Sequence, residues 1–104
     1  MQYYQVLISA EDKEQATNVL DALLAKKLIV GGPILQGPTR FWWKGEIVDM
    51  PEYSYILTYT TEKLKQAVIE EYEKVSAEEV PMVSFIPFEG NPKLIELIDK
   101  TLGS

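Results

Sequence analysis

Apolar and polar positions alternate at the start of the chain and then change to a helical period. The alternation over residues 3–9 predicts a β-strand with one buried face. The apolar residues that follow recur at i, i+3, i+4 and i+7, which predicts a helix from Glu11 to Lys27 with Ser9 or Asp12 as its N-cap. The buried stripe of this helix is predicted to contain Ala16, Val19, Leu20, Leu23, Leu24 and Leu28.

Glycine and proline interrupt the pattern in the next segment. Gly31-Gly32-Pro33 and Gly37-Pro38 predict irregular backbone or an edge strand, because proline has no amide hydrogen for a β-ladder. The β-prone runs 40–43 and 46–48 are joined by Lys44-Gly45, which predicts a hairpin whose glycine takes a positive φ.

The second half of the chain repeats the order of strand and helix. A turn is expected at Met50-Pro51-Glu52, followed by a long strand over residues 53–60. A second helix is expected from Glu62 to about Val75, with Thr60 or Thr61 as its cap, and then a strand over residues 82–88. Asn91-Pro92 predicts the start of a terminal helix, with Asn91 as N-cap and proline at the first helical position.

This order of elements predicts an α+β fold. It matches the ferredoxin-like βαββαβ sandwich, an antiparallel sheet with two helices on one face, here with an additional C-terminal helix; residues 1–104 are expected to form a single domain. The other face would expose a set of apolar and tyrosine side chains, and self-association would cover it. This set consists of Tyr3, Leu7, Tyr53, Tyr55, Leu57 and Tyr59.

Composition narrows the classes of function. The net charge is −6, and the ten basic residues form no stripe that could follow nucleic-acid phosphates. Cysteine and histidine are absent, which removes disulfides, thiolate and imidazole metal sites and histidine-dependent triads. No apolar run is long enough to cross a membrane, and the first residues lack the pattern of a secretory signal, so a cytoplasmic location is expected. No catalytic set is predicted.

Three short motifs resemble those of the CutA family of divalent-cation tolerance proteins. They are Phe41-Trp42-Trp43-Lys44-Gly45-Glu46-Ile47, Glu79-Val80-Pro81, and Phe85-Ile86-Pro87 followed by Gly90-Asn91-Pro92. The resemblance covers nearly the whole chain in element order. It implies a ferredoxin-like subunit in a tight homotrimer with a part in divalent metal tolerance or response.

The chain also departs from the family pattern. Ser76-Ala77-Glu78 stands where the family usually has His-Pro-Tyr, and Val30-Gly31-Gly32 stands where it usually has Cys-Val-Asn. The missing imidazole and thiolate are the donors that copper and zinc prefer. A cofactor is therefore not certain, although a divalent cation is a candidate ligand.

The candidate ligand cleft between subunits consists of Arg40, Trp43, Tyr59 and Glu78. Arg40 could bind an anion or form a structural ion pair. Glu78 and Glu79 are weak candidates for a hard cation, with solvated surface acid as the alternative, and no spacing shows paired carboxylates for hydrolysis. Gly31-Gly32 is expected to be a turn rather than a phosphate loop, because no Walker or Gly-x-Gly-x-x-Gly pattern surrounds it.

The residues expected at the oligomer interface are Trp42, Trp43, Tyr53, Tyr55 and Tyr59. The two tryptophans could instead form an aromatic wall for a ligand. The predicted function is a CutA-like homotrimeric binding or regulatory protein that is not an enzyme. The alternative is a PII-like trimeric signalling protein that binds a nucleotide or small anion in its intersubunit clefts.

Overall fold

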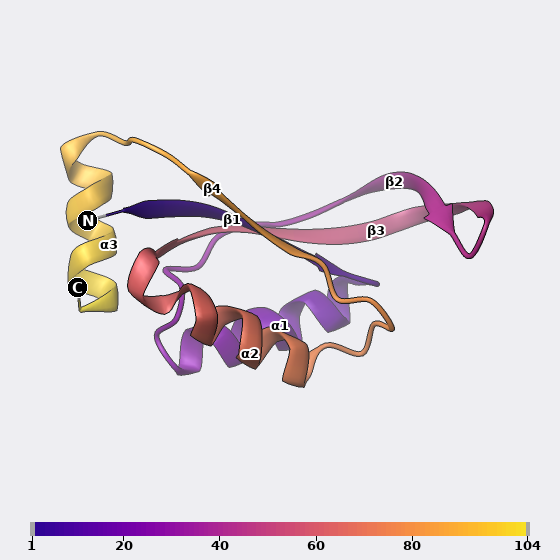
Figure 1. Ribbon diagram of the computed structural model, residues 1–104, viewed down its shortest axis with the longest axis horizontal. Coiled ribbons are helices and arrows are strands. Elements are labelled where there is room, and N and C mark those ends of the chain that lie inside the picture. Colours follow the sequence, from indigo (N-terminus) through magenta and orange to yellow (C-terminus); the bar gives the residue numbers. More distant parts are fainter. Residues whose placement is uncertain (1, 104) are drawn as a thin grey trace.

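A four-stranded antiparallel sheet with the strand order β2-β3-β1-β4 forms the middle of the molecule (Figure 1). The computed structural model describes residues 2–103. Its elements are β1 (Tyr3–Ala10), α1 (Lys13–Ala25), β2 (Ile34–Trp43), β3 (Glu46–Thr61), the 3₁₀ turn η1 (Glu62–Leu64), α2 (Lys65–Val75), β4 (Val83–Pro87) and α3 (Pro92–Leu102). The predicted ferredoxin-like α+β arrangement with an added C-terminal helix is therefore confirmed.

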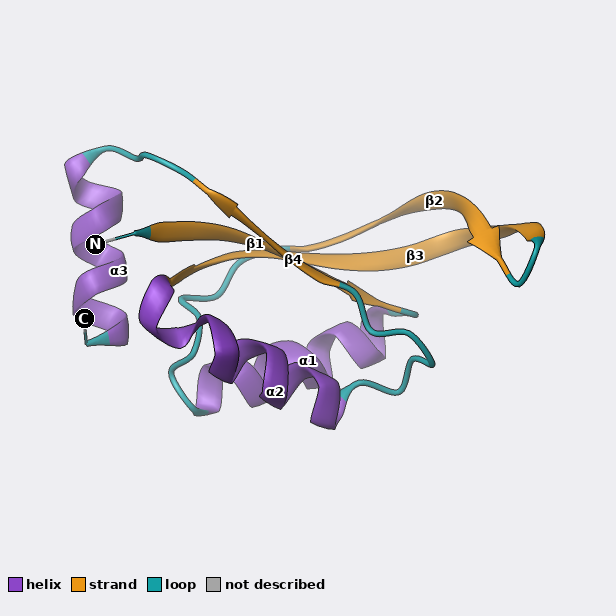
Figure 2. Ribbon diagram, in the orientation of Figure 1, coloured by secondary structure: helices purple, strands orange, loops and turns teal. Residues whose placement is uncertain are grey.

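The main core lies between the sheet and the helices α1 and α2, which both cover the same face (Figure 2). The alternation predicted for β1 is confirmed, since Tyr4, Val6 and Ile8 are buried on this face. The rest of the core comes from the end of β1, the two helices, the central strand β3 and the segment after α1. It contains Ala10, Ala16, Val19, Leu23, Leu28, Ile29, Ile56, Val68 and Tyr72.

The helices begin close to the predicted positions. Asp12 caps α1, and its Oδ1 accepts a hydrogen bond from the backbone N–H of Gln15 at 2.9 Å. The second helical segment starts at Glu62 as expected, but its first turn is a 3₁₀ turn and its N-cap Thr61 makes no side-chain capping bond. The Thr60 hydroxyl instead donates to the backbone oxygen of Leu28 at 2.7 Å, which ties β3 to the segment after α1.

The predicted turn at Met50-Pro51-Glu52 is wrong, because β3 runs without interruption from Glu46 to Thr61. The register of β2 and β3 steps from Gly37 opposite Tyr53 to Thr39 opposite Met50. Pro38 therefore lies opposite two residues in a β-bulge, where the ladder is interrupted and an amide hydrogen is not needed. Residues 31–38 were expected to form either irregular backbone or an edge strand. From Ile34 onward the edge strand is confirmed, since β2 lies at the sheet edge.

The hairpin predicted around Lys44-Gly45 is confirmed. Both turn residues have positive φ, 51° for Lys44 and 84° for Gly45, as a two-residue type I′ turn requires. The β2–β3 hairpin extends well beyond the two helices and forms a long arm at one end of the molecule (Figure 1). We call this projecting part, residues 39–50, the arm.

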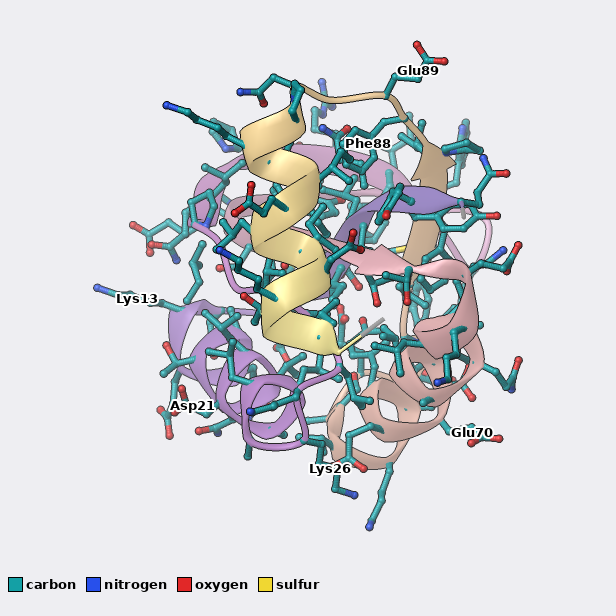
Figure 3. The ribbon with its side chains drawn as sticks, turned by 90° about the vertical axis from the view of Figure 1, so that its left-hand side faces the viewer. Lys13, Asp21, Lys26, Glu70, Phe88 and Glu89 are labelled. Atoms are coloured by element: carbon teal, nitrogen blue, oxygen red, sulfur yellow. The ribbon has the colours of Figure 1, made fainter. Side chains whose placement is uncertain are left out.

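The helix α3 lies across the opposite end of the sheet from the arm (Figure 1). It begins at Pro92 with Asn91 as N-cap, as predicted. The Tyr3 hydroxyl donates to Oδ1 of Asp99 at 2.8 Å, and the rings of Tyr59 and Phe88 lie 5.1 Å apart. Figure 3 shows Phe88 beside α3, whereas Glu89 points outward. The chain itself thus covers this end of the face that was expected to be open.

Among residues 2–103, no helix is both long and apolar enough to cross a membrane.

Candidate functional site

A hollow of about 620 Å³ lies where the arm meets the segment between α2 and β4. Aromatic and apolar side chains of the two arm strands form most of one wall, and the segment 77–82 forms the other. The arm residues that line it are Thr39, Arg40, Phe41, Trp42, Trp43, Val48 and Met50, joined by Tyr53 and Tyr55 of the same strand β3. The remaining lining residues are Glu11, Ala77, Glu78, Glu79, Val80 and Met82. We call this the arm hollow.

The structure brings together three of the four residues predicted for the ligand cleft. Arg40, Trp43 and Glu78 all line the arm hollow, although they lie far apart in the sequence. Tyr59 does not line it, because its ring packs on Phe88 beside α3. The predicted cleft is therefore only partly assembled within one chain.

Glu78 is the centre of a hydrogen-bond network with three hydroxyl groups. Its Oε1 accepts from the Ser9 hydroxyl at 2.7 Å and lies 3.4 Å from the Tyr72 hydroxyl, and its Oε2 accepts from the Tyr53 hydroxyl. The backbone N–H of Glu78 donates to the Ser76 side chain at 3.1 Å. The alternative of a freely solvated surface acid is thus wrong for Glu78, whose carboxylate is held by donors from two strands and a helix.

Tyr53 and Tyr72 contribute neutral hydroxyl groups to this network. Burial raises the pKa of Tyr53, and its hydrogen bond to Glu78 raises that pKa further. Burial also raises the pKa of Tyr72, whose side chain is fully buried. Both hydroxyls therefore keep their protons and act as donors, Tyr53 to Glu78 and Tyr72 to the backbone oxygen of Ser9 at 2.7 Å.

Two further charged residues of the arm hollow, Arg40 and Glu79, form ion pairs with nearby residues. The Arg40 Nε lies 2.6 Å from Oδ1 of Asp49, its partner in the β2–β3 register, which favours the structural ion pair over a free anion site. The Lys44 Nζ lies 3.3 Å from Oε2 of Glu79. Both pairs are exposed, so each contributes little to stability, about 0–1 kcal/mol.

The donors present do not fit a tight metal site within one chain. The Glu78 oxygens already accept hydroxyl hydrogens, and Glu79 faces the Lys44 ammonium. A hard cation needs several oxygen acceptors that converge on one point, and among residues 2–103 no three acidic side chains do so. Copper and zinc would find neither imidazole nor thiolate.

Gly31-Gly32 forms a close passage rather than an anion cradle. Gly31 has φ +96°, and its backbone oxygen accepts from the Thr58 hydroxyl at 3.0 Å. A Cβ on Gly32 would lie 1.9 Å from the backbone oxygen of Leu57. The two glycines thus let the chain run directly against β3, and they lie in irregular backbone rather than in the expected turn.

The five residues predicted at an oligomer interface differ in exposure. Trp42 is 72% exposed at the arm, whereas Trp43, Tyr55 and Tyr59 are half-buried. Tyr53 is only 2% exposed, so the expectation that a lone chain would expose it is wrong: its ring packs on Phe41 and Tyr55, and its hydroxyl reaches Glu78. A role for these residues between subunits stays a prediction.

Sequence reasoning missed Ser9 and Tyr72 as parts of the site. The sequence pattern offers Ser9 only as a possible helix cap, and it places Tyr72 on the apolar side of the second helix. A tyrosine on the buried side of a helix needs a hydrogen-bond partner for its hydroxyl. That requirement was the signal in the sequence that Tyr72 takes part in a polar network. The partners themselves come from strands and loops that only the fold brings near.

The chain is similar in sequence to proteins of one family. The family described as "CutA1 divalent ion tolerance protein" matches residues 4–101. A "Divalent-cation tolerance protein CutA" of Archaeoglobus fulgidus is 30% identical over 98 residues, which cover 93% of this chain and 95% of the relative. A protein of the same description from Thermotoga maritima is 35% identical over 72 residues, covering 69% of this chain and 70% of the relative.

Solved structures show the same fold. The "periplasmic divalent cation tolerance protein CutA" from Archaeoglobus fulgidus has a TM-score of 0.88 at 26% identity, covering 96% of this chain and 98% of that one. A "divalent cation tolerance protein (Cut A1)" from Thermus thermophilus has a TM-score of 0.87 at 24% identity, covering 95% and 97%. The likeness in fold therefore extends over almost the full length of both chains.

Proposed function

Because the chain belongs to the CutA1 divalent ion tolerance family, we propose that it is a homotrimeric binding protein that takes part in the response to divalent metal ions. Its ligand site is the arm hollow, with Arg40, Trp43 and Glu78 in the lining. It acts by binding and assembly rather than by catalysis. In support, Glu78, the lining carboxylate best placed for acid–base chemistry, is held by hydroxyl donors and has no basic partner in its network.

The observation that carries the assembly is an uncovered apolar row across the sheet face opposite α1 and α2. Leu35 of β2 pairs with Tyr55, and Leu7 of β1 pairs with Leu57, so these side chains share one face. Leu35 is 48% exposed and Leu7 37% exposed. A contiguous apolar surface of this kind is typical of an interface between proteins. The exposed Trp42 on the arm adds a second apolar surface that another copy would cover.

The assembly is tested by light scattering coupled to size-exclusion chromatography at micromolar concentration. We expect a species of three times the 11.8 kDa chain mass. Leu35→Glu places a charge in the apolar row and should produce smaller species, because a buried unpaired charge costs several kcal/mol at an interface. Leu24→Glu is the control, since Leu24 is a similarly exposed leucine (39%) on α1. A wild-type protein that elutes as a lone chain would contradict the proposal.

Metal binding gives a separate test of how the protein takes part in the metal response. From the donor set we expect equilibrium dialysis to detect no copper or zinc bound below millimolar concentration, and at most weak magnesium binding. If magnesium does bind, Glu78→Gln and Glu79→Gln should each weaken it. Tight binding of copper or zinc to the wild-type protein would show that the trimer creates a site from donors that one chain does not bring together.

The PII-like alternative receives less support from the geometry. The single arginine that could hold a phosphate is paired with Asp49, and the arm hollow carries more carboxylates than basic groups. The cytoplasmic location also stays a prediction, since the structure from Archaeoglobus fulgidus is described as periplasmic.

A further inference from the structure

The lining of the arm hollow contains several aromatic rings that lie close together. The Phe41 and Tyr53 ring centres lie 5.6 Å apart, and those of Tyr53 and Tyr55 lie 5.3 Å apart, both in edge-on arrangements. Trp43 lies in the same lining. In an edge-on pair, the edge of one ring lies against the face of the other. The face of an aromatic ring attracts positive charge.

The charged lining of the arm hollow has a negative balance. Glu11, Glu78 and Glu79 contribute carboxylates, whereas Arg40 is the only basic residue in the lining. The positive charge of Arg40 is offset by Asp49, whose Oδ1 lies 2.6 Å from the Arg40 Nε. With a net charge of −6 over the whole chain, the field at the hollow favours a cation over an anion.

The chain already places one ammonium group at the edge of this hollow. The Lys44 Nζ lies 5.5 Å from the centre of the Trp43 ring and 3.3 Å from Oε2 of Glu79. An aromatic face on one side and a carboxylate on the other are the two groups that recognise an organic ammonium ion. Lys44 is 67% exposed, so this resident cation is free to move away into solvent.

We propose that the arm hollow binds a small organic cation, an ammonium group carried on an aromatic or aliphatic body, in competition with the Lys44 side chain. The apolar body of the ligand would lie against Phe41, Tyr55 and Met82, and its ammonium group would lie between Trp43 and Glu79. The inference rests on the proposed function in taking the arm hollow as the ligand site. It adds the chemical class of the ligand, which a divalent metal ion does not share.

The proposal is tested by calorimetric titration at neutral pH and low salt with three probes that share one body. These are 2-phenylethylammonium, 2-phenylethanol and phenylacetate, which are positive, neutral and negative. We expect the cation to bind about tenfold more tightly than the alcohol, and the anion to bind most weakly. Equal affinity for cation and alcohol, or a preference for the anion, would overturn the proposal.

Two variants test the roles of Lys44 and Glu79. Lys44→Asn removes the resident ammonium and keeps a residue that tolerates φ +51°, so the cation should bind several-fold more tightly. Glu79→Gln should weaken the cation several-fold and leave the alcohol unchanged. Glu96→Gln is the matched control, because Glu96 is an exposed carboxylate paired with a lysine on α3, far from the hollow. Unchanged cation affinity in Lys44→Asn would contradict the proposed competition.

The same samples separate this inference from the proposed function. If the protein is trimeric and none of the probes binds, a neighbouring copy fills the arm hollow, and the ligand inference fails while the assembly stands. If the cation binds selectively to a lone chain, the ligand inference stands and the assembly fails.

Discussion

Gly32→Ala is expected to lower the free energy of unfolding by about 3 kcal/mol or more, the upper range for overpacking. The added Cβ would lie 1.9 Å from the backbone oxygen of Leu57 and 3.1 Å from its carbonyl carbon. Neither the backbone of residues 30–33 nor that of β3 can move away easily. The Leu57 N–H donates to the Pro33 oxygen at 3.2 Å, and the Val30 N–H donates to the Tyr59 oxygen at 3.3 Å. Relief of the clash therefore requires the loss of backbone hydrogen bonds.

Urea unfolding followed by circular dichroism measures this effect, and Gly37→Ala is its matched control. Gly37, like Gly32, directly precedes a proline, but a Cβ there would meet nothing within 4 Å. We expect Gly37→Ala to change the free energy of unfolding by less than about 0.5 kcal/mol, as for an ordinary surface substitution. Equal stability of the two variants would mean that residues 30–33 do not run against β3 as described.

Tyr72→Phe is expected to destabilise the protein by about 2 kcal/mol, although it removes only one oxygen atom. The Tyr72 hydroxyl donates to the Ser9 backbone oxygen at 2.7 Å and accepts from the Met82 N–H at 3.1 Å. It also lies 2.9 Å from the Ser9 side-chain oxygen. Without this hydroxyl, buried polar groups of Ser9 lose a partner that water cannot replace.

The measurement combines urea unfolding with amide hydrogen exchange. The N–H of Met82 should exchange faster in Tyr72→Phe, because one of its two acceptors is gone and only the Ser9 Oγ at 3.2 Å remains. Tyr55→Phe is the control, a tyrosine in β3 that takes no part in this network. If both variants lose the same stability, the network around Glu78 does not hold the segment between α2 and β4.

Several structural features followed from local rules that act within a few residues. Asp12 was identifiable as a helix cap because its side chain bonds an amide three residues away. The Lys44-Gly45 hairpin followed from the need for positive φ between two β-prone runs. Both depend on neighbours in the chain, so the sequence contains the whole interaction.

The Met50-Pro51-Glu52 segment shows where local rules fail. A proline interrupts a strand when the neighbouring strand needs a hydrogen bond from the amide hydrogen that proline lacks. Pro51 lies in the β-bulge opposite Pro38, where the ladder is already interrupted, so β3 continues past it. The register of two strands decides this, and a single strand does not carry that information.

The sequence by itself determined the order of elements, the family, and the absence of imidazole and thiolate chemistry, because periodicity, motifs and composition are properties of the chain. Only the tertiary structure decided that Glu78 is held by Ser9, Tyr53 and Tyr72, and that Tyr59 lies beside α3 rather than in the arm hollow. These contacts join residues up to 69 positions apart. Their partners are set by sheet register and helix packing, which arise from the whole fold at once.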